Sequence, residues 1–202
     1  MKGKTLALIT VYTIATTLFA SPMAAQAAVQ TFGLLSGANE NPPTGAPGTG
    51  SATVIIDPAA NTMRVEVTFS GLTGDPTGAH IHCCVTQGGN TGVATTVPVF
   101  PGFPTTMTSG TYDQTLNMLD LGSYNPTFVT ANGGTAASAE AVLFAGIMSD
   151  RAYLNIHTSS NPGGEIRAFL VPTPLPSAFP LFATGLGALG LLGWRRKKTA
   201  AG

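Results

Sequence analysis

Hydrophobic and polar residues alternate most regularly between Met63 and Ser70. Met63, Val65, Val67 and Phe69 are apolar, and the residues between them are polar. A period of two is that of a β-strand with one buried face. Similar short runs follow one another along the middle of the chain, separated by turn residues, which predicts an all-β fold, an antiparallel sandwich. The expected strands span residues 29–36, 50–56, 63–70, 79–84, 95–100, 109–116, 151–158 and 165–171.

The period changes after residue 124. Asn125-Pro126 has the form of an N-cap followed by proline at the first helical position, and Gly133-Gly134 has the form of a helix end. Residues 135–148 are rich in alanine, and their larger apolar side chains fall on one side of a helix. We therefore expect a short helical insertion in the connection before the last two strands.

The first 27 residues have the pattern of a secretory signal peptide. A short basic start is followed by an apolar run over residues 6–20, and residues 25–27 form an A-x-A cleavage site. The apolar run is short and a cleavage site follows it, which distinguishes a signal peptide from a membrane span. We expect delivery through the Sec machinery and cleavage after Ala27.

A second apolar segment lies near the other end of the chain. Residues 178–194 carry no charge, follow a proline-rich extended spacer, and precede Arg195-Arg196-Lys197-Lys198. As a helix, this segment would span roughly 25 Å of a bilayer core about 30 Å thick. We therefore expect a transmembrane helix. The basic cluster should stay cytoplasmic and leave the rest of the protein outside.

The chain between these two terminal segments is acidic. Residues 28–170 contain three arginines, no lysine and nine acidic residues, which gives a net charge of −6. Nucleic-acid binding needs clustered Lys and Arg, so nucleic acid is excluded as a partner. About 140 residues suffice for one domain with its own core. We divide the chain into a signal peptide (1–27), one domain (28–171) and a C-terminal segment (172–202).

The candidate chemistry of this domain lies in two histidine motifs. On a strand over residues 79–84, His80, His82 and Cys84 share one face, and Asn155 and His157 share a face of a later strand. If the two strands are neighbours, three imidazoles gather, as in many copper and zinc sites. One hypothesis is therefore a single metal ion with Cys84 or an acid as fourth ligand. The other is a polar network in which hydrogen-bonded histidines hold the strands in register.

The remaining polar residues of interest allow several interpretations. The adjacent Cys83 and Cys84 form a vicinal disulfide, stay as two buried thiols, or supply one metal thiolate, and the first two rank equally. We expect an ion-pair cluster of Glu40, Glu165 and Arg167, which together with Asn155 makes a structural network. The alternative is that these side chains lie on a solvated edge of the sheet. We find no nucleophile elbow, P-loop or dinucleotide fingerprint, so no catalytic residue is predicted.

Four segments of the domain resemble a known family. They are Leu35–Pro43, Ser70–Leu72, Ala79–His82 and Tyr153–Arg167. Taken in order, they are similar to the CHRD (chordin-type) domain, and the resemblance runs from about residue 32 to residue 170. It implies a secreted β-sandwich of the immunoglobulin or superoxide dismutase kind, whose biochemical role is largely unknown. In animal chordins, repeats of this domain belong to a protein that binds growth factors, a role that the resemblance does not carry over to this chain.

The C-terminal segment resembles the PEP-CTERM sorting signal. The residues that carry this likeness are Val171, Pro172 and Pro174, the apolar segment, and the basic cluster that begins with Arg195 and Arg196. Thr173-Pro174 replaces the Glu-Pro pair of the namesake motif. The resemblance implies that the helix anchors the protein transiently in the inner membrane, until an exosortase recognises and cleaves the segment. It also implies a Gram-negative bacterium that makes exopolysaccharide.

A weaker likeness concerns the histidines themselves. Gly71-Leu72 followed by His80-Ile81-His82 is similar to segments of Cu/Zn superoxide dismutase, which is also a β-sandwich. The paired copper–zinc site of that enzyme needs more histidines than the three in this chain. A complete paired site is therefore excluded, and a mononuclear site stays open.

Two functional hypotheses follow from the sequence. The first is an exported, non-enzymatic module at the cell surface or in the exopolysaccharide matrix, where it takes part in adhesion or binds a polysaccharide or protein ligand. The second is a mononuclear copper- or zinc-binding protein, with a redox enzyme as one form of it, that uses the His-x-His strand and the third histidine.

Overall fold

The structure is a computed structural model that describes residues 28–173. The expected signal peptide with its cleavage site at Ala27, and the chain from Pro174 onward with Arg195 and Arg196, lie outside the described residues. Between residues 28 and 173, no helix is long and apolar enough to cross a membrane.

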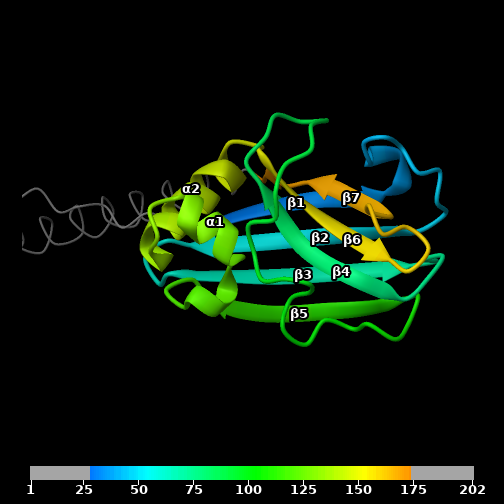
Figure 1. The fold of residues 1–202 in the computed structure, drawn as a ribbon, viewed down its shortest axis with the longest axis horizontal. Helices are drawn as coiled ribbons and strands as arrows, with labels where there is room; N and C mark the ends of the chain where they lie inside the picture. Colours follow the sequence, from blue (N-terminus) through cyan, green and yellow to red (C-terminus); the bar gives the residue numbers. More distant parts are fainter. Residues whose placement is uncertain (1–27, 174–202) are drawn as a thin grey trace, which may run out of the picture.

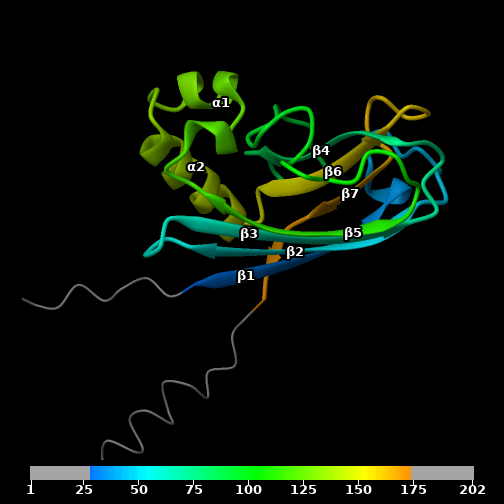
Figure 2. The ribbon, with the colours of Figure 1, turned by 90° about the horizontal axis from the view of Figure 1, so that it is seen from below.

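The described residues form one antiparallel sheet of eight strands that curls into two layers. The strand order is β4-β6-β7-β1-β2-β3-β5, and β8 pairs with β1. Figure 2 shows β1, β2, β3 and β5 in one layer and β4, β6 and β7 in the other. The strands are β1 (Val29–Ser36), β2 (Thr49–Asp57), β3 (Thr62–Ser70), β4 (Pro76–Cys83), β5 (Gly110–Asn117), β6 (Ala152–Thr158), β7 (Ile166–Phe169) and β8 (Val171–Pro172).

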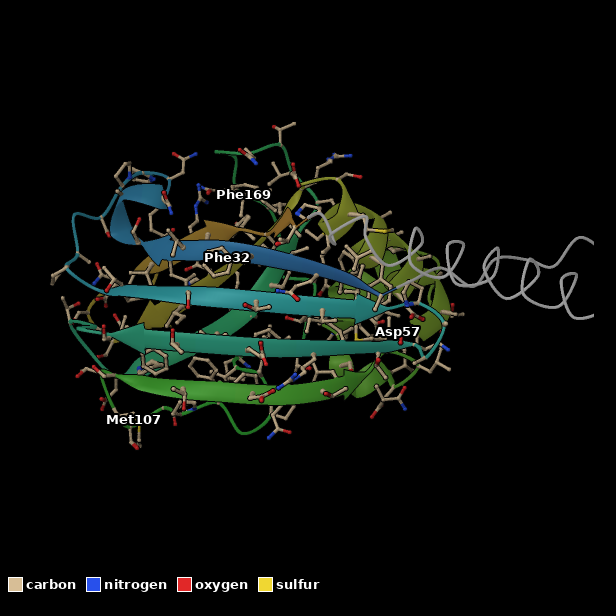
Figure 3. The ribbon with its side chains drawn as sticks, turned by 180° about the vertical axis from the view of Figure 1, so that it is seen from behind. Phe32, Asp57, Met107 and Phe169 are labelled. Carbon is tan, nitrogen blue, oxygen red and sulfur yellow. A yellow bond between two sulfur atoms is a disulfide. The ribbon has the colours of Figure 1, made fainter. Side chains whose placement is uncertain are left out.

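The core lies between the two layers and follows the predicted alternation. Val65 and Val67 of β3 point inward and are at most 1% exposed, as are Ile81 of β4 and Leu154 of β6. The opposite face of β2, β3 and β5 is polar and faces solvent. Figure 3 looks onto this outer face, with Phe32 on the neighbouring strand β1. The all-β sandwich expected from the sequence is confirmed at the level of a curled antiparallel sheet.

Two short helices cover one end of the sandwich (Figure 1). In α1 (Pro126–Ala131) the Asn125 side chain accepts a hydrogen bond from the Thr127 amide, and proline occupies the first turn. In α2 (Ala136–Met148) Thr135 caps the first turn through a capping box with Ser138. Both helices lie between β5 and β6, so the predicted helical insertion is confirmed. Local capping chemistry explains why the sequence located them correctly.

The strand expected over residues 95–100 does not form. This segment makes isolated bridges instead, and it runs along the free edge of β4. The Ala79 amide donates to the Pro98 carbonyl, and the Phe100 amide donates to the Ala79 carbonyl. Because Pro98 has no amide hydrogen, regular pairing cannot continue through it. The segment covers an edge that would otherwise expose unpaired backbone groups.

The last predicted strand is split in two. β7 ends at Phe169, and the chain then crosses to β1, where Val171 of β8 pairs with Phe32 and Pro172 pairs with Thr31. The Thr173 amide donates to the Gln30 carbonyl. The first residues expected in the proline spacer therefore belong to the folded domain.

Candidate metal centre

Strand pairing brings the three histidines together. β4 and β6 are antiparallel neighbours, with His80 opposite Asn155 and Gly78 opposite His157. Ile81 points into the core, so His80 and His82 point to the other face of β4. A Cβ atom at Gly78 would lie 3.1 Å from the His157 ring, so the glycine makes room for that imidazole. The predicted gathering of three imidazoles is present.

The three rings form a compact cluster. The Nε2 atoms of His80 and His157 are 3.1 Å apart. One ligand atom from each histidine can be chosen so that all three lie within 4.8 Å of one another. His80 is 6% exposed and His82 is 8% exposed, whereas His157 is partly open to solvent. Solvent therefore approaches the cluster from the side of His157.

Each ring is oriented by a backbone carbonyl from a loop. Nδ1 of His80 donates to Pro98, Nδ1 of His82 donates to Thr91 and Nδ1 of His157 donates to Pro162, at 2.8–2.9 Å. A carbonyl oxygen only accepts, so each Nδ1 carries a hydrogen. A neutral imidazole has one N–H, which leaves a lone pair on each Nε2. A metal ion bound at Nε2 requires this tautomer. In metalloproteins the tautomer is usually fixed in the same way, by a hydrogen bond from the other ring nitrogen to a carbonyl or carboxylate.

Burial keeps two of these rings neutral. It lowers the pKa of His80 to about 3, with the neighbouring His82 and His157 adding to the effect against the Pro98 carbonyl. Burial likewise lowers the pKa of His82 to about 4, against the Thr91 carbonyl. The Nε2 atoms of His80 and His157 are 3.1 Å apart, so either a cation lies between them or one Nε2 donates a hydrogen to the other. Nε2 of His82 is buried and has no hydrogen-bond partner among the described residues.

The geometry is compatible with one transition-metal ion. Two imidazole nitrogens on a tetrahedral zinc lie about 3.3 Å apart, given bonds of about 2.0–2.1 Å. The three ligand atoms lie within 4.8 Å of one another, so the widest pair must approach by up to about 1.5 Å to reach this tetrahedral spacing. Three neutral imidazoles are a donor set of zinc and copper sites and leave a coordination position open.

A comparison with protein families identifies the domain that holds this cluster. The family model for the CHRD domain matches residues 32–170. The chain belongs to the CHRD-domain family. The matched residues include all three histidines, so the cluster lies inside the CHRD domain. A search of the curated proteins and a search of the solved structures give no match to this chain.

Cys84 is not part of the histidine cluster of this CHRD domain. β4 ends at Cys83, so the strand alternation that would align Cys84 with His82 stops one residue earlier. Cys84 forms a disulfide with Cys83 and contacts the carbonyl of Val142 on α2. Of the three states left open by the sequence, the vicinal disulfide is the one observed, and the expected Cys84 ligand is wrong. Within residues 28–173, the group that could hold an ion contains the three histidines alone.

Arg167 anchors two loops, one of which carries the Thr91 carbonyl that orients His82. The side chain is 1% exposed and donates to the carbonyls of Asn39 and Gly89 and to the side-chain oxygen of Asn90. Its guanidinium carbon lies 4.8 Å from the centre of the Tyr153 ring. The arginine therefore ties the loop before β2 and the loop after β4 to the outer face of β6 and β7.

Part of the predicted acidic network is present around Arg167. Glu40 is buried, and its Oε2 atom lies 3.9 Å from the Arg167 Nε atom. Burial raises the pKa of Glu40 to about 7, although Arg167 works in the opposite direction. A Cβ atom at Gly164 (φ +123°) would lie within 3.0 Å of both Glu40 and Asn155, so these three residues are in close proximity. Glu40, Arg167 and Asn155 thus lie together.

Glu165 lies elsewhere, which corrects the expected cluster. It precedes β7, so strand alternation does not align it with Arg167. Its carboxylate accepts hydrogen bonds from the amide and hydroxyl of Thr73, the hydroxyl of Thr158 and the amide group of Asn161. Burial opposes ionisation, but these hydrogen bonds outweigh it and lower the pKa of Glu165. The carboxylate fastens the turn before β4 to the turn before β7.

Sequence reasoning missed the groups that orient the rings. The three carbonyls belong to Thr91, Pro98 and Pro162, which lie in loops without a recognisable motif. Tyr153 was also missed, although alternation places it on the same face as Asn155 and His157. That pattern could have identified it as a neighbour of the cluster.

Proposed function

We propose that this CHRD domain binds one copper or zinc ion through the Nε2 atoms of His80, His82 and His157. The observation that carries the proposal is the set of three Nδ1–carbonyl hydrogen bonds, which leaves three lone pairs on neighbouring Nε2 atoms. A purely structural network uses both nitrogens of a buried histidine, whereas Nε2 of His82 has no hydrogen-bond partner among the described residues.

The ligand set favours copper(II) or zinc among the divalent ions. Imidazole suits both metals, and affinities along the first transition row reach their maximum at copper. Three neutral ligands leave the charge of the ion uncompensated, and they leave room for a water molecule as the fourth ligand. The partly exposed ring of His157 marks the side from which an exogenous ligand would arrive.

Metal titration of the purified protein, with its disulfide intact, tests this function. After treatment with a chelator, we expect one zinc or copper ion per chain by isothermal titration and elemental analysis. The folded state should then be stabilised by about 2.7 kcal/mol at a free metal concentration one hundred times Kd.

His82→Gln is the decisive variant because it removes one buried ligand and keeps a polar side chain. Replacing a mere outer-shell partner costs about 10- to 100-fold in metal affinity, so removing one of three direct ligands should cost at least about 100-fold. Thr115→Ala, on the exposed face of β5, is the control and should bind as the parent protein does. Absence of saturable binding in the parent, or equal binding by His82→Gln, would exclude the metal site. Nitrogen NMR of the rings would then show whether a second proton bridges His80 and His157.

We also propose that the protein is exported and sorted to the cell surface or the exopolysaccharide matrix, where it acts as a binding or adhesion module. The Cys83–Cys84 disulfide supports an oxidising compartment, because disulfides are rare in the cytosol. The sorting step depends on the C-terminal segment and on an exosortase, which the PEP-CTERM resemblance implies. Metal binding and matrix location are compatible functions of one exported domain.

Deletion of residues 177–202 tests the sorting proposal and leaves β8 intact. We expect the deletion to move the protein from the cell surface to the soluble extracellular or periplasmic fraction, measured by immunodetection in each fraction. Replacing Arg195 and Arg196 with alanine should shift the protein from the cell surface in the same way but to a smaller extent, because part of the basic cluster remains. An unchanged distribution of the deletion variant would contradict a sorting role for the segment.

A further inference from the structure

Tyr153 lies directly against one of the three imidazoles. Its ring is parallel to that of His82, with an interplanar angle of 8° and 4.5 Å between the ring centres. The two residues are opposite each other in the pairing of β4 with β6. Tyr153 is 2% exposed, so its ring has a fixed place in the packing. One side of the His82 ring is therefore held by a flat aromatic surface.

The hydroxyl of Tyr153 contacts the same residue that orients His82. The Thr91 carbonyl accepts from Nδ1 of His82 at 2.8 Å and from the Tyr153 hydroxyl at 3.4 Å. The Thr91 amide in turn donates to the Tyr153 hydroxyl oxygen at 3.3 Å. Both backbone groups of Thr91 thus meet Tyr153, and the carbonyl that sets the His82 tautomer is held in place by it.

Tyr153 is itself fixed by its other neighbours. The guanidinium carbon of Arg167 lies 4.8 Å from its ring centre, and the Phe169 ring centre lies 5.2 Å away. Arg167 also binds the side chain of Asn90, the residue just before Thr91. The ring and the loop that carries Thr91 are therefore anchored to the same arginine.

We propose that Tyr153 is a positioning residue of the metal centre, which fixes both the direction of the His82 ring and the nitrogen that carries its hydrogen. The proposal rests on the proposed metal site and adds a role for a residue that is not a ligand. Outer-shell partners of metal ligands change affinity by about 10- to 100-fold when they are replaced. Tyr153 acts through both the ring and the hydroxyl, and two substitutions separate these effects.

Tyr153→Leu removes the ring and the hydroxyl, and Phe169→Leu is the matched control. Phe169 packs against Tyr153 on the same face, and among residues 28–173 its ring contacts the Tyr153 ring and not the His82 ring. We expect both variants to lower the thermal stability of the metal-free protein. Only Tyr153→Leu should lower zinc affinity by about 10- to 100-fold in a chelator competition, and only it should alter the EPR spectrum of the copper(II) form. Equal affinities of the two variants would overturn the proposal.

Tyr153→Phe provides a readout that needs no metal and is expected to fold. It keeps the stacked ring and removes the hold on Thr91. In the metal-free protein we expect nitrogen NMR to show a hydrogen at Nδ1 of His82, and we expect this hydrogen to exchange with solvent faster in Tyr153→Phe. Unchanged exchange would overturn the role of the hydroxyl. If the parent protein binds no metal, the proposed metal site is wrong. If the parent protein and Tyr153→Leu bind metal with equal affinity, only the positioning role of Tyr153 is wrong.

Discussion

Replacing Glu165 with alanine is expected to destabilise the protein by more than about 3 kcal/mol, because donors from three residues lose a buried charged acceptor. The carboxylate is fully buried and accepts hydrogen bonds from Thr73, Thr158 and Asn161. The turn that contains Asn161 also carries Pro162, whose carbonyl orients His157. Loss of the carboxylate should therefore loosen the third metal ligand as well. Urea denaturation followed by circular dichroism measures the free energy of unfolding.

Two further variants test the origin of this effect. Glu165→Gln keeps the size of the side chain and one acceptor, so it should be destabilised less than Glu165→Ala. Glu66→Ala is the control because its carboxylate meets Arg64 at 2.6 Å on the exposed face of the sheet. Pairs of this exposed kind contribute little to stability, so this variant should unfold almost as the parent protein does. Similar losses for Glu66→Ala and Glu165→Ala would show that the buried carboxylate has no special role.

The metal-free protein is expected to lose stability on acidification from about pH 6.5 to pH 4. The folded pKa values of His80 and His82 are about 3 and about 4, below the ordinary value of 6.5. In this range the unfolded chain binds protons that the folded protein does not, so the free energy of unfolding rises with pH. Each histidine contributes up to about 1.4 kcal/mol per pH unit.

Glu40 contributes with the opposite sign. Its folded pKa of about 7 lies above the ordinary 4.5, so between these values the folded protein binds the additional proton. This group alone makes the protein more stable as the pH falls, and it offsets one of the two histidines. Taken together, these three groups give a loss of stability on acidification that corresponds to about one proton between pH 4.5 and 6.5, and the raised pKa of the buried Glu140 opposes part of this loss.

Single variants resolve these contributions in urea titrations at several pH values. Glu40→Gln should steepen the dependence of stability on pH, because the opposing group is removed. His82→Gln should flatten it. An identical dependence in the parent and both variants would show that these buried groups do not control acid stability.

Local patterns in the sequence determined the secondary structure. Alternation over Met63–Ser70 located β3, and Asn125-Pro126 located the start of α1, because strand periodicity and helix capping depend on residues close in the chain. The same alternation placed His80 and His82 on one face of β4. The pattern was misleading over residues 95–100, where the backbone hydrogen bonds go to the edge of β4.

The candidate site could be predicted only in part. Two histidines separated by one residue indicated a shared face, but the distance of His157 depended on the pairing of β4 with β6, across 77 residues of chain. Cys84 was assigned wrongly because alternation was extended one residue past the end of β4. Glu165 was assigned wrongly because it lies one residue before β7.

The sequence by itself determined that the chain has strand-forming segments, a helical insertion and two histidine motifs, since these depend on side-chain chemistry at short spacing. Only the tertiary structure decided which nitrogen of each histidine is free. That choice is made by the carbonyls of Thr91, Pro98 and Pro162, which reach the rings through loops that have no periodicity of their own. The chemistry of the site therefore depends on contacts between distant segments, which no local pattern records.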